Sequence, residues 1–244
     1  APARPRLPAE QVVDSLHAAA GLPIDVEELT LDPDGRRPAN NRQNFGRARR
    51  AWMFVSLSNE RDRPSLTLPA AASVVEVLET FGWSADRQSP RTDRETDPNV
   101  LQPGVLANSA LTVRLTRAAY GSPLADLAVE ASSPEALVES VFIRFLGREP
   151  SPQEREEFAS ALTDGFDARL VPEEEVRPPD PPERLPRVTW SNHLRSEATT
   201  IQQEWARRVR QGPPPDPRLA PDWREAYEDF VWSLVNTGEF VWIP

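Results

Sequence analysis

Hydrophobic residues recur at spacings of three and four along much of the chain, and this period predicts a mainly α-helical fold. Between residues 9 and 20, Val12, Val13 and Leu16 fall on one helical face, and Gly21 follows as a stop signal. Pro69 opens a second segment of this kind, which ends at Gly82. The same reasoning predicts further helices over 98–119, 133–146, 151–162 and 197–211, and a last one from 222.

Other segments lack this period or interrupt it. Residues 22–50 are rich in Asp, Asn, Pro and Gly, which predicts a long irregular segment. The apolar run 51–57 is short, and we interpret it as extended. Asp97 and Pro98 predict a helix start, and the Pro-Gly pair at 103–104 predicts a bend or break in the helix that follows.

A proline-rich segment suggests how the chain is divided. Between residues 171 and 187, six of 17 residues are Pro, which is typical of a stiff linker or strap. We therefore expect a main helical domain with Arg-rich loops over 1–170 and a C-terminal helical unit over 188–244. A stripe of large residues in the last helix, from Trp223 through Tyr227 and Phe230 to Leu234, predicts that this unit docks on the main domain. The fold class is an irregular multi-helix domain with long ordered loops and a C-terminal two-helix unit.

Composition excludes several kinds of chemistry. The chain of 244 residues has no Cys, which removes disulfides, thiol nucleophiles, thiolate metal sites and covalent haem attachment. Every basic residue is Arg, so no lysine can form a Schiff base or serve a P-loop. No apolar run is long enough to span a bilayer, which predicts no transmembrane segment. The start of the chain, without Met or a signal-type stretch, suggests an excised piece.

The charge is negative overall but unevenly placed. The net charge of -10 disfavours nucleic acid as a partner. Residues 120–180 carry 14 acidic residues against five Arg, whereas 36–50 carry six Arg and no acidic residue. A local anion-binding loop is therefore compatible with the composition. Its candidate residues are Arg42, Arg47, Arg49, Arg50 and Trp52. The alternative is a solvated loop, or one that folds back on the acidic region.

Two further segments combine Arg with acidic residues and form either an ion-pair network or a binding site. Its candidate residues are Arg61, Arg63, Arg91, Asp93, Arg94 and Asp97. We favour a structural ion-pair network. An anion-binding cleft is the alternative, and paired carboxylates acting as acid and base, as in glycosidases, are a weaker one.

Metal binding and triad catalysis are not predicted. Oxygen side chains at 93, 95, 97 and 99 have the spacing of a calcium loop, but Pro98 stands where such a loop needs Gly. The two histidines, His17 and His193, have no partner at ligand spacing, and there is no Gly-x-Ser-x-Gly motif. We therefore predict no catalytic residue and no metal ligand.

Four landmarks occur together in a fixed order: RRAWMF at 49–54 with SNERDRP at 58–64, RTDRETDPNVLQP at 91–103, FLGREPSPQE at 145–154, and FVWSLVNTGEF at 230–240. In these segments the chain resembles the later part of a planctomycete-specific C-terminal domain of unknown function. Members of that family follow a cytochrome-c-like domain and a second family-specific domain in large exported proteins. The resemblance implies a periplasmic or cell-surface setting and a haem held only in a neighbouring domain, with no cofactor in this chain.

The sequence and the resemblance together favour a non-catalytic interaction or structural module of an exported multidomain protein. Its expected partners are protein domains of the same chain or of a surface assembly, and polysaccharide is a further candidate. The alternatives are a carbohydrate- or anion-binding module that uses the Arg-rich loops, and a carbohydrate-active enzyme with paired carboxylates.

Overall fold

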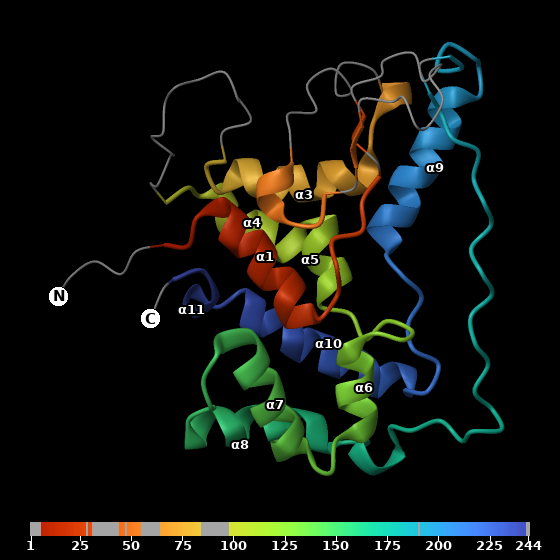
Figure 1. Cartoon of the computed structure of the whole chain (residues 1–244). Helices are drawn as coiled ribbons and strands as arrows, with labels where there is room; N and C mark the ends of the chain where they lie inside the picture. The colour runs from red at the N-terminus through yellow and green to blue at the C-terminus, as the bar shows by residue number, and fades with distance from the viewer. Residues whose placement is uncertain are drawn as a thin grey trace.

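The fold is mainly helical, which confirms the predicted class (Figure 1). The computed structural model describes residues 6–27, 29–30, 44–46, 48–54, 64–83, 98–189 and 191–242. Among the described residues, none of the helices combines the length and apolar character needed to cross a bilayer. Two short antiparallel strands, β1 (Leu29–Thr30) and β2 (Asn44–Gly46), pair with a register shift.

The first helix, α1 (Ala9–Ala20), has the bounds that the sequence predicted. Gly21 ends it in the left-handed conformation, with φ 68°. The second predicted helix is α3 (Pro69–Thr80), which packs directly against α1. Pro69 occupies its first turn, where a missing backbone N–H leaves no hydrogen bond unmade.

The extended structure expected for 51–57 is wrong where the structure describes it. Ala51–Met53 form a 3-10 helix, η2, and a second one, η3, spans Pro64–Leu66. Ala48, Ala51 and Phe54 are buried, whereas Trp52 is exposed. Burial at every third residue fits the three-residue turn of a 3-10 helix and contradicts the two-residue period of a strand.

The helix predicted over 98–119 is two helices, and both its start and its break differ from the prediction. α4 is Leu101–Asn108, so it begins three residues after Pro98 and continues through the Pro-Gly pair. Pro103 lies in the first turn, where its missing N–H has no intrahelical partner to lose. The break comes at Ser109, which is extended and accepts a hydrogen bond from the Thr112 N–H to start α5 (Ala110–Leu115).

Three helices follow α5, and the first of them was not predicted from the sequence. α6 (Pro123–Glu130) begins after Ser122, whose side chain caps it. The two predicted helices that follow, α7 (Pro134–Leu146) and α8 (Pro152–Thr163), form an antiparallel hairpin. A short 3-10 helix, η4 (Phe166–Ala168), comes after them.

Residues 171–187 contain no helix or strand and run along the edge of the molecule from the end of α8 towards the start of α9 (Figure 1). α9 (Ala198–Gln211) packs against α3 and α5, whereas α10 (Pro221–Val235) packs against α7 and α8. The two C-terminal helices therefore contact different parts of the fold. The last helix, predicted from residue 222, begins one residue earlier at Pro221, so Asp222 lies in its first turn and Ala220 is the N-cap. The short α11 (Gly238–Val241) completes the chain's helices.

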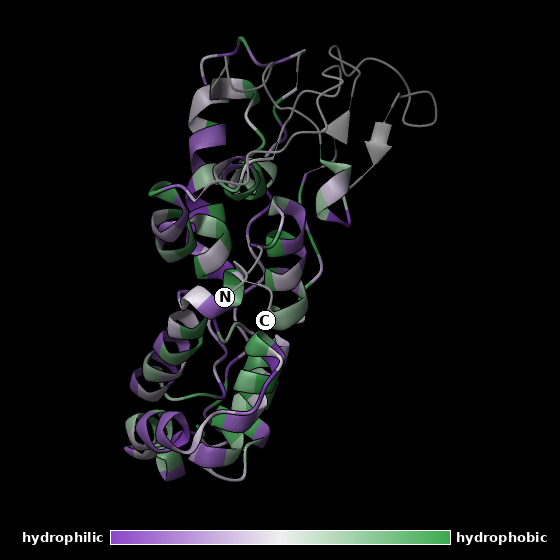
Figure 2. Ribbon diagram, turned by 90° about the vertical axis from the view of Figure 1, so that its left-hand side faces the viewer, coloured by the Kyte–Doolittle hydropathy of each residue, from purple (hydrophilic) through white to green (hydrophobic). Residues whose placement is uncertain are grey.

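The core runs through the whole elongated body (Figure 2). The predicted stripe on α10 is buried, and Tyr227 at its centre is 0% exposed and donates its hydroxyl to the Leu124 carbonyl at 3.1 Å. Phe230 contacts Phe158 with ring centroids 4.8 Å apart. Helices from both halves of the sequence thus share one hydrophobic interior, and the two described chain ends lie together, since Leu7 N–H donates to Val241 O at 2.9 Å.

Candidate functional site

Most residues that the sequence proposed as a binding site lie outside the described residues and stay predictions. They are Arg42, Arg47, Arg61, Arg63, Arg91, Asp93, Arg94 and Asp97. Three candidates are described: Arg49, Arg50 and Trp52 are all exposed and lie in or beside η2. The exposure of these three side chains is compatible with both predictions for this loop, a solvated loop and an anion-binding loop, because a ligand could reach them.

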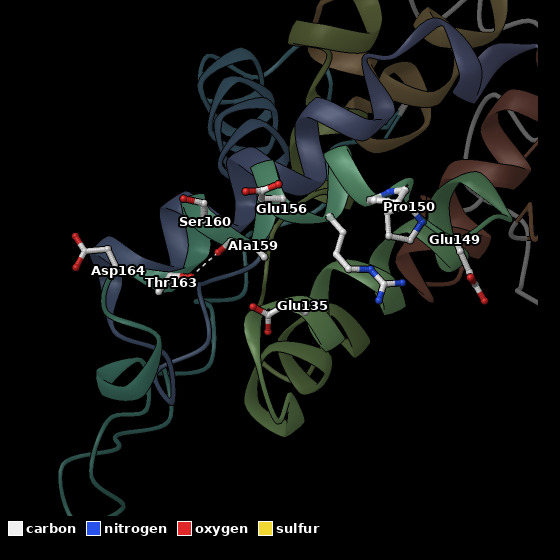
Figure 3. A pocket seen from close by; sticks show the side chains of 10 residues that line it. Glu135, Glu149, Pro150, Glu156, Ala159, Ser160, Thr163 and Asp164 are labelled. Carbon is white, nitrogen blue, oxygen red and sulfur yellow. Dashed lines mark hydrogen bonds between the residues drawn. The ribbon is translucent and has the colours of Figure 1, made fainter.

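A second surface feature was not predicted: an open groove along the α7–α8 hairpin (Figure 3). We call it the α7–α8 groove, and its volume is about 1170 Å³. Its polar lining consists of Glu135, Glu149, Arg155, Glu156, Ser160, Thr163 and Asp164.

Local sequence signals fix the two helices that form this groove. Ser133 caps α7, and Gly147 ends it with φ 68°. Ser151 and Glu154 form a capping box at the start of α8: the Ser151 N–H donates to the Glu154 carboxylate at 2.7 Å, and the Glu154 N–H donates back to the Ser151 hydroxyl at 3.3 Å. The loop between the helices is consequently short and held at both ends.

An arginine ties this loop to the C-terminal segment. Arg148 donates to the carboxylates of Glu154 and Glu239, with shortest distances of 2.8 Å and 2.6 Å. Hydrogen bonds from Arg148 lower the pKa of the Glu154 carboxyl to about 2, although burial opposes the shift. The same residue therefore stabilises the end of the groove and docks α11 beside it.

The groove has a negative charge that its own residues do not neutralise. Four carboxylates line it, against the single guanidinium of Arg155. That guanidinium already pairs with Glu139 on α7, with Nη2 3.2 Å from Oε2. Figure 3 shows that both helices of the groove contribute carboxylates, Glu135 from α7 and Glu156 from α8. The arrangement favours a cationic ligand.

The groove does not present a catalytic arrangement among its described residues. Its hydroxyls belong to Ser160 and Thr163, and the Thr163 hydroxyl donates to the Ala159 carbonyl at 2.7 Å, as is common for threonine within a helix. No histidine lines it. In the described part of the chain, no three His, Asp or Glu side chains are grouped as a metal site.

The histidine of α1 has a structural environment. His17 is 5% exposed, and its Nδ1 lies 3.0 Å from the Leu22 carbonyl oxygen. Burial lowers the pKa of His17 from 6.5 to about 4, despite this hydrogen bond. The imidazole is therefore neutral at pH 7 and helps to close the C-terminal turn of α1.

The first two thirds of the chain match the model of a known protein family. The model of the PSD1 family, described as a protein of unknown function (DUF1553), matches residues 1–162. The chain belongs to the PSD1 family. Its match ends within α8, so it includes α1 and α3 to α7 but neither the strap nor the helices after it. No curated protein and no solved structure matches the chain.

One property of the groove in this PSD1-family chain, its negative charge, was predictable from the sequence, whereas its concave shape was not. The excess of acidic residues over 120–180 indicated that this part of the surface is negative. It could not indicate a concave surface, because that depends on how far α7 and α8 lie apart between Pro150 at one end and Asp164 at the other. Helical periodicity alone assigns Glu156 and Asp164 to solvent without saying what they face.

Proposed function

We propose that this chain is a non-catalytic interaction module of a longer exported protein, and that its α7–α8 groove receives an arginine- or lysine-bearing segment of a partner domain. The observation that carries the proposal is the uncompensated charge of the groove: the single cation that lines it already pairs with Glu139. An incoming guanidinium or ammonium group would pair with Glu149, Glu156 and Asp164, which form no ion pair within the described residues.

The resemblance to a planctomycete-specific C-terminal domain supplies the setting of this proposal. The partner would be another domain of the same multidomain chain or of a surface assembly, in the periplasm or at the cell surface. A neighbouring cytochrome-c-like domain would hold any haem, and this chain would carry no cofactor. The division into a main domain over 1–170, a strap over 171–187 and a docked unit over 188–244 belongs to the same proposal.

The groove is suited to such a partner because its walls are fixed before binding. The capping box and the pairing of Arg148 with Glu154 and Glu239 hold the loop between α7 and α8 in place. Preorganised walls reduce the ordering cost of association, so a few exposed ion pairs can give a measurable affinity. The exposed position of Glu149, Glu156 and Asp164 keeps them accessible to a partner.

The test is a calorimetric titration of the chain with a synthetic peptide of alternating Arg and Ser, at low and moderate salt. The groove variant combines Glu149→Gln, Glu156→Gln and Asp164→Asn. Exposed ion pairs contribute about 0.2–1 kcal/mol each, so we expect the three changes together to weaken binding roughly tenfold.

A matched control removes the same charge elsewhere. Glutamates 173–175 lie on the strap and are exposed, so changing all three to Gln lowers the net negative charge equally. We expect this control to bind the peptide as the unchanged chain does. Equal weakening in both variants would show that the peptide responds only to the overall charge, and would refute the groove as a docking site.

A further inference from the structure

A second surface of the molecule, on the other half of the sequence from the groove, presents basic and aromatic side chains. The turn that carries η2 is fixed to the body of the fold on one side. Ala48, Ala51 and Phe54 are 1%, 0% and 2% exposed. Asp14 of α1 accepts a hydrogen bond from the Ala51 N–H at 3.0 Å. The backbone of this turn is thus held rigidly against α1.

The other side of the same turn faces solvent. Arg49 and Arg50 are exposed, and Trp52 is 69% exposed. Neither arginine forms an ion pair within the described ranges. Two exposed arginines therefore precede an exposed tryptophan by two and three residues, on a turn whose backbone position is already fixed.

Trp52 differs from other tryptophans of the chain in what its indole N–H contacts. The indoles of Trp205, Trp223 and Trp232 donate to the carbonyls of other segments at 3.3, 2.9 and 2.9 Å. Trp52 has no such acceptor within the described part of the structure. Burying an indole is one of the larger apolar contributions a single side chain can make. A mostly exposed tryptophan whose N–H has no acceptor among the described residues is consequently not explained by packing.

We propose that Arg49, Arg50 and Trp52 form a binding site for an anionic sugar, namely a pyranose ring that carries a sulfate or a carboxylate. The apolar face of such a ring would stack on the indole, and the acidic substituent would pair with one or both guanidinium groups. The three residues lie within four positions of the chain, so their Cα atoms are at most about 10 Å apart. Long arginine side chains can therefore reach a substituent on a ring stacked on Trp52.

The charge of the whole chain selects against longer polyanions at this site. A net charge of -10 repels nucleic acid, whose binding depends on neutralising many phosphates. A short sugar with one or two acidic groups requires only the local cations. This site would act independently of the α7–α8 groove, because the two surfaces have opposite charge and share no residue.

The experiment is a calorimetric titration of the full chain with four ligands: a sulfated tetrasaccharide, a uronic acid tetrasaccharide, a neutral tetrasaccharide and a short single-stranded DNA. The first two arms distinguish sulfate from carboxylate as the group recognised. We expect binding of at least one acidic sugar, weaker at higher salt, and no binding of the neutral sugar or the DNA.

Two variants localise the site. Trp52→Ala and the pair Arg49→Gln with Arg50→Gln should each weaken binding of the acidic sugar by about tenfold or more. Because all three side chains are exposed, neither variant should lower the unfolding temperature appreciably. The matched control, Arg184→Gln with Arg187→Gln, removes two exposed arginines from the strap and should leave binding unchanged.

Several outcomes would overturn the proposal. They are an absence of binding by either acidic sugar, equal binding of the neutral sugar, and an unchanged affinity after Trp52→Ala. Binding of the DNA with the same dependence on Arg49 and Arg50 would assign the site to phosphates of nucleic acid instead. None of these outcomes depends on the arginine-peptide titration at the groove.

Discussion

Acid destabilisation through His17 gives the sharpest test of the interior of this fold. The Leu22 carbonyl can only accept a hydrogen bond, so Nδ1 of His17 carries the ring proton and donates it. Nε2 is buried and has no hydrogen-bond partner among the described residues. Protonation of Nε2 would therefore place a charge in the core close to Arg114, which also disfavours the cation, while Asp14 favours it only weakly.

The magnitude follows from the pKa difference between the folded and unfolded states. The pKa of His17 is lowered from 6.5 to about 4, and at about 1.4 kcal/mol per pKa unit the full effect is about 3 kcal/mol. The unfolded chain binds the proton more tightly, so this stability is complete above pH 6.5 and is lost as the pH falls towards 4. Between pH 7.5 and 5.0 the loss amounts to about 2 kcal/mol.

The assay is urea unfolding at pH 7.5 and 5.0 for the unchanged chain and for His17→Asn. Asparagine can keep a donor near the Leu22 carbonyl but does not titrate. We expect the unchanged chain to lose about 2 kcal/mol more than the variant between the two pH values. If His17→Asn loses as much stability as the unchanged chain between the two pH values, the conclusion that His17 is buried in its neutral form is wrong.

Two other substitutions test how the helices are joined. Gly21→Ala should destabilise the chain by more than about 1 kcal/mol, because Gly21 has φ 68° and an added Cβ would lie 2.8 Å from Pro123 Cγ and overlap the Arg144 guanidinium. Its control, Gly104→Ala, meets nothing within 4 Å and should be neutral or stabilise α4 by up to about 1 kcal/mol; thermal unfolding of both variants gives the comparison. Asp216→Asn should lower the free energy of unfolding in urea by about 1–3 kcal/mol. The buried carboxylate accepts hydrogen bonds from the backbone and guanidinium of Arg218, and Arg218 is partly exposed and keeps its pair with Asp126. An unchanged free energy of unfolding would refute this role.

Helices with a signal at each end were predictable from sequence. The Ser-Pro start at 133–134 and Gly147 define α7, and the capping box from Ser151 defines the start of α8. The same Ser-Pro signal occurs at 122–123 and begins α6, which we did not predict. That helix has only eight residues, and its short apolar pattern does not stand out from the surrounding loops.

The errors fall where a contact distant in sequence decides the local structure. The turn at 51–53 is set by burial of Ala51 and by its N–H bond to Asp14, 37 residues earlier. The α7–α8 groove was not predicted for the same reason, since sequence gives the charges of its walls but not their separation. The break at Ser109 is a different case, because it depends on a local contact: the Ser109 hydroxyl accepts a hydrogen bond from the Thr112 N–H and caps the next helix.

Charged side chains distant in sequence also form hydrogen bonds with the unpaired backbone groups at several helix ends. These charges have a structural role, which distinguishes them from charges that are available for binding. Glu27 accepts hydrogen bonds from the first N–H groups of α3, at Ala70 and Ala71, at 2.9 and 2.8 Å. Arg169 is 7% exposed and donates to the carbonyls at the end of α6, including that of Ala128 at 2.9 Å. Arg144 donates in the same way to the end of α1, at the Ala19 carbonyl.

A high content of arginine and carboxylate is therefore not by itself a sign of ligand binding in this chain. Charges that satisfy a helix end or a buried partner are accounted for by the fold, because removing them would leave unpaired polar groups in the interior. The informative charges are those on a fixed backbone that lack such a partner. Among the described residues, Arg49 and Arg50 meet this condition. So do Glu149, Glu156 and Asp164 of the α7–α8 groove, whose single cation pairs with Glu139. The two surfaces differ in sign, so a partner that joined both would have to carry a basic segment and an acidic group at separate positions.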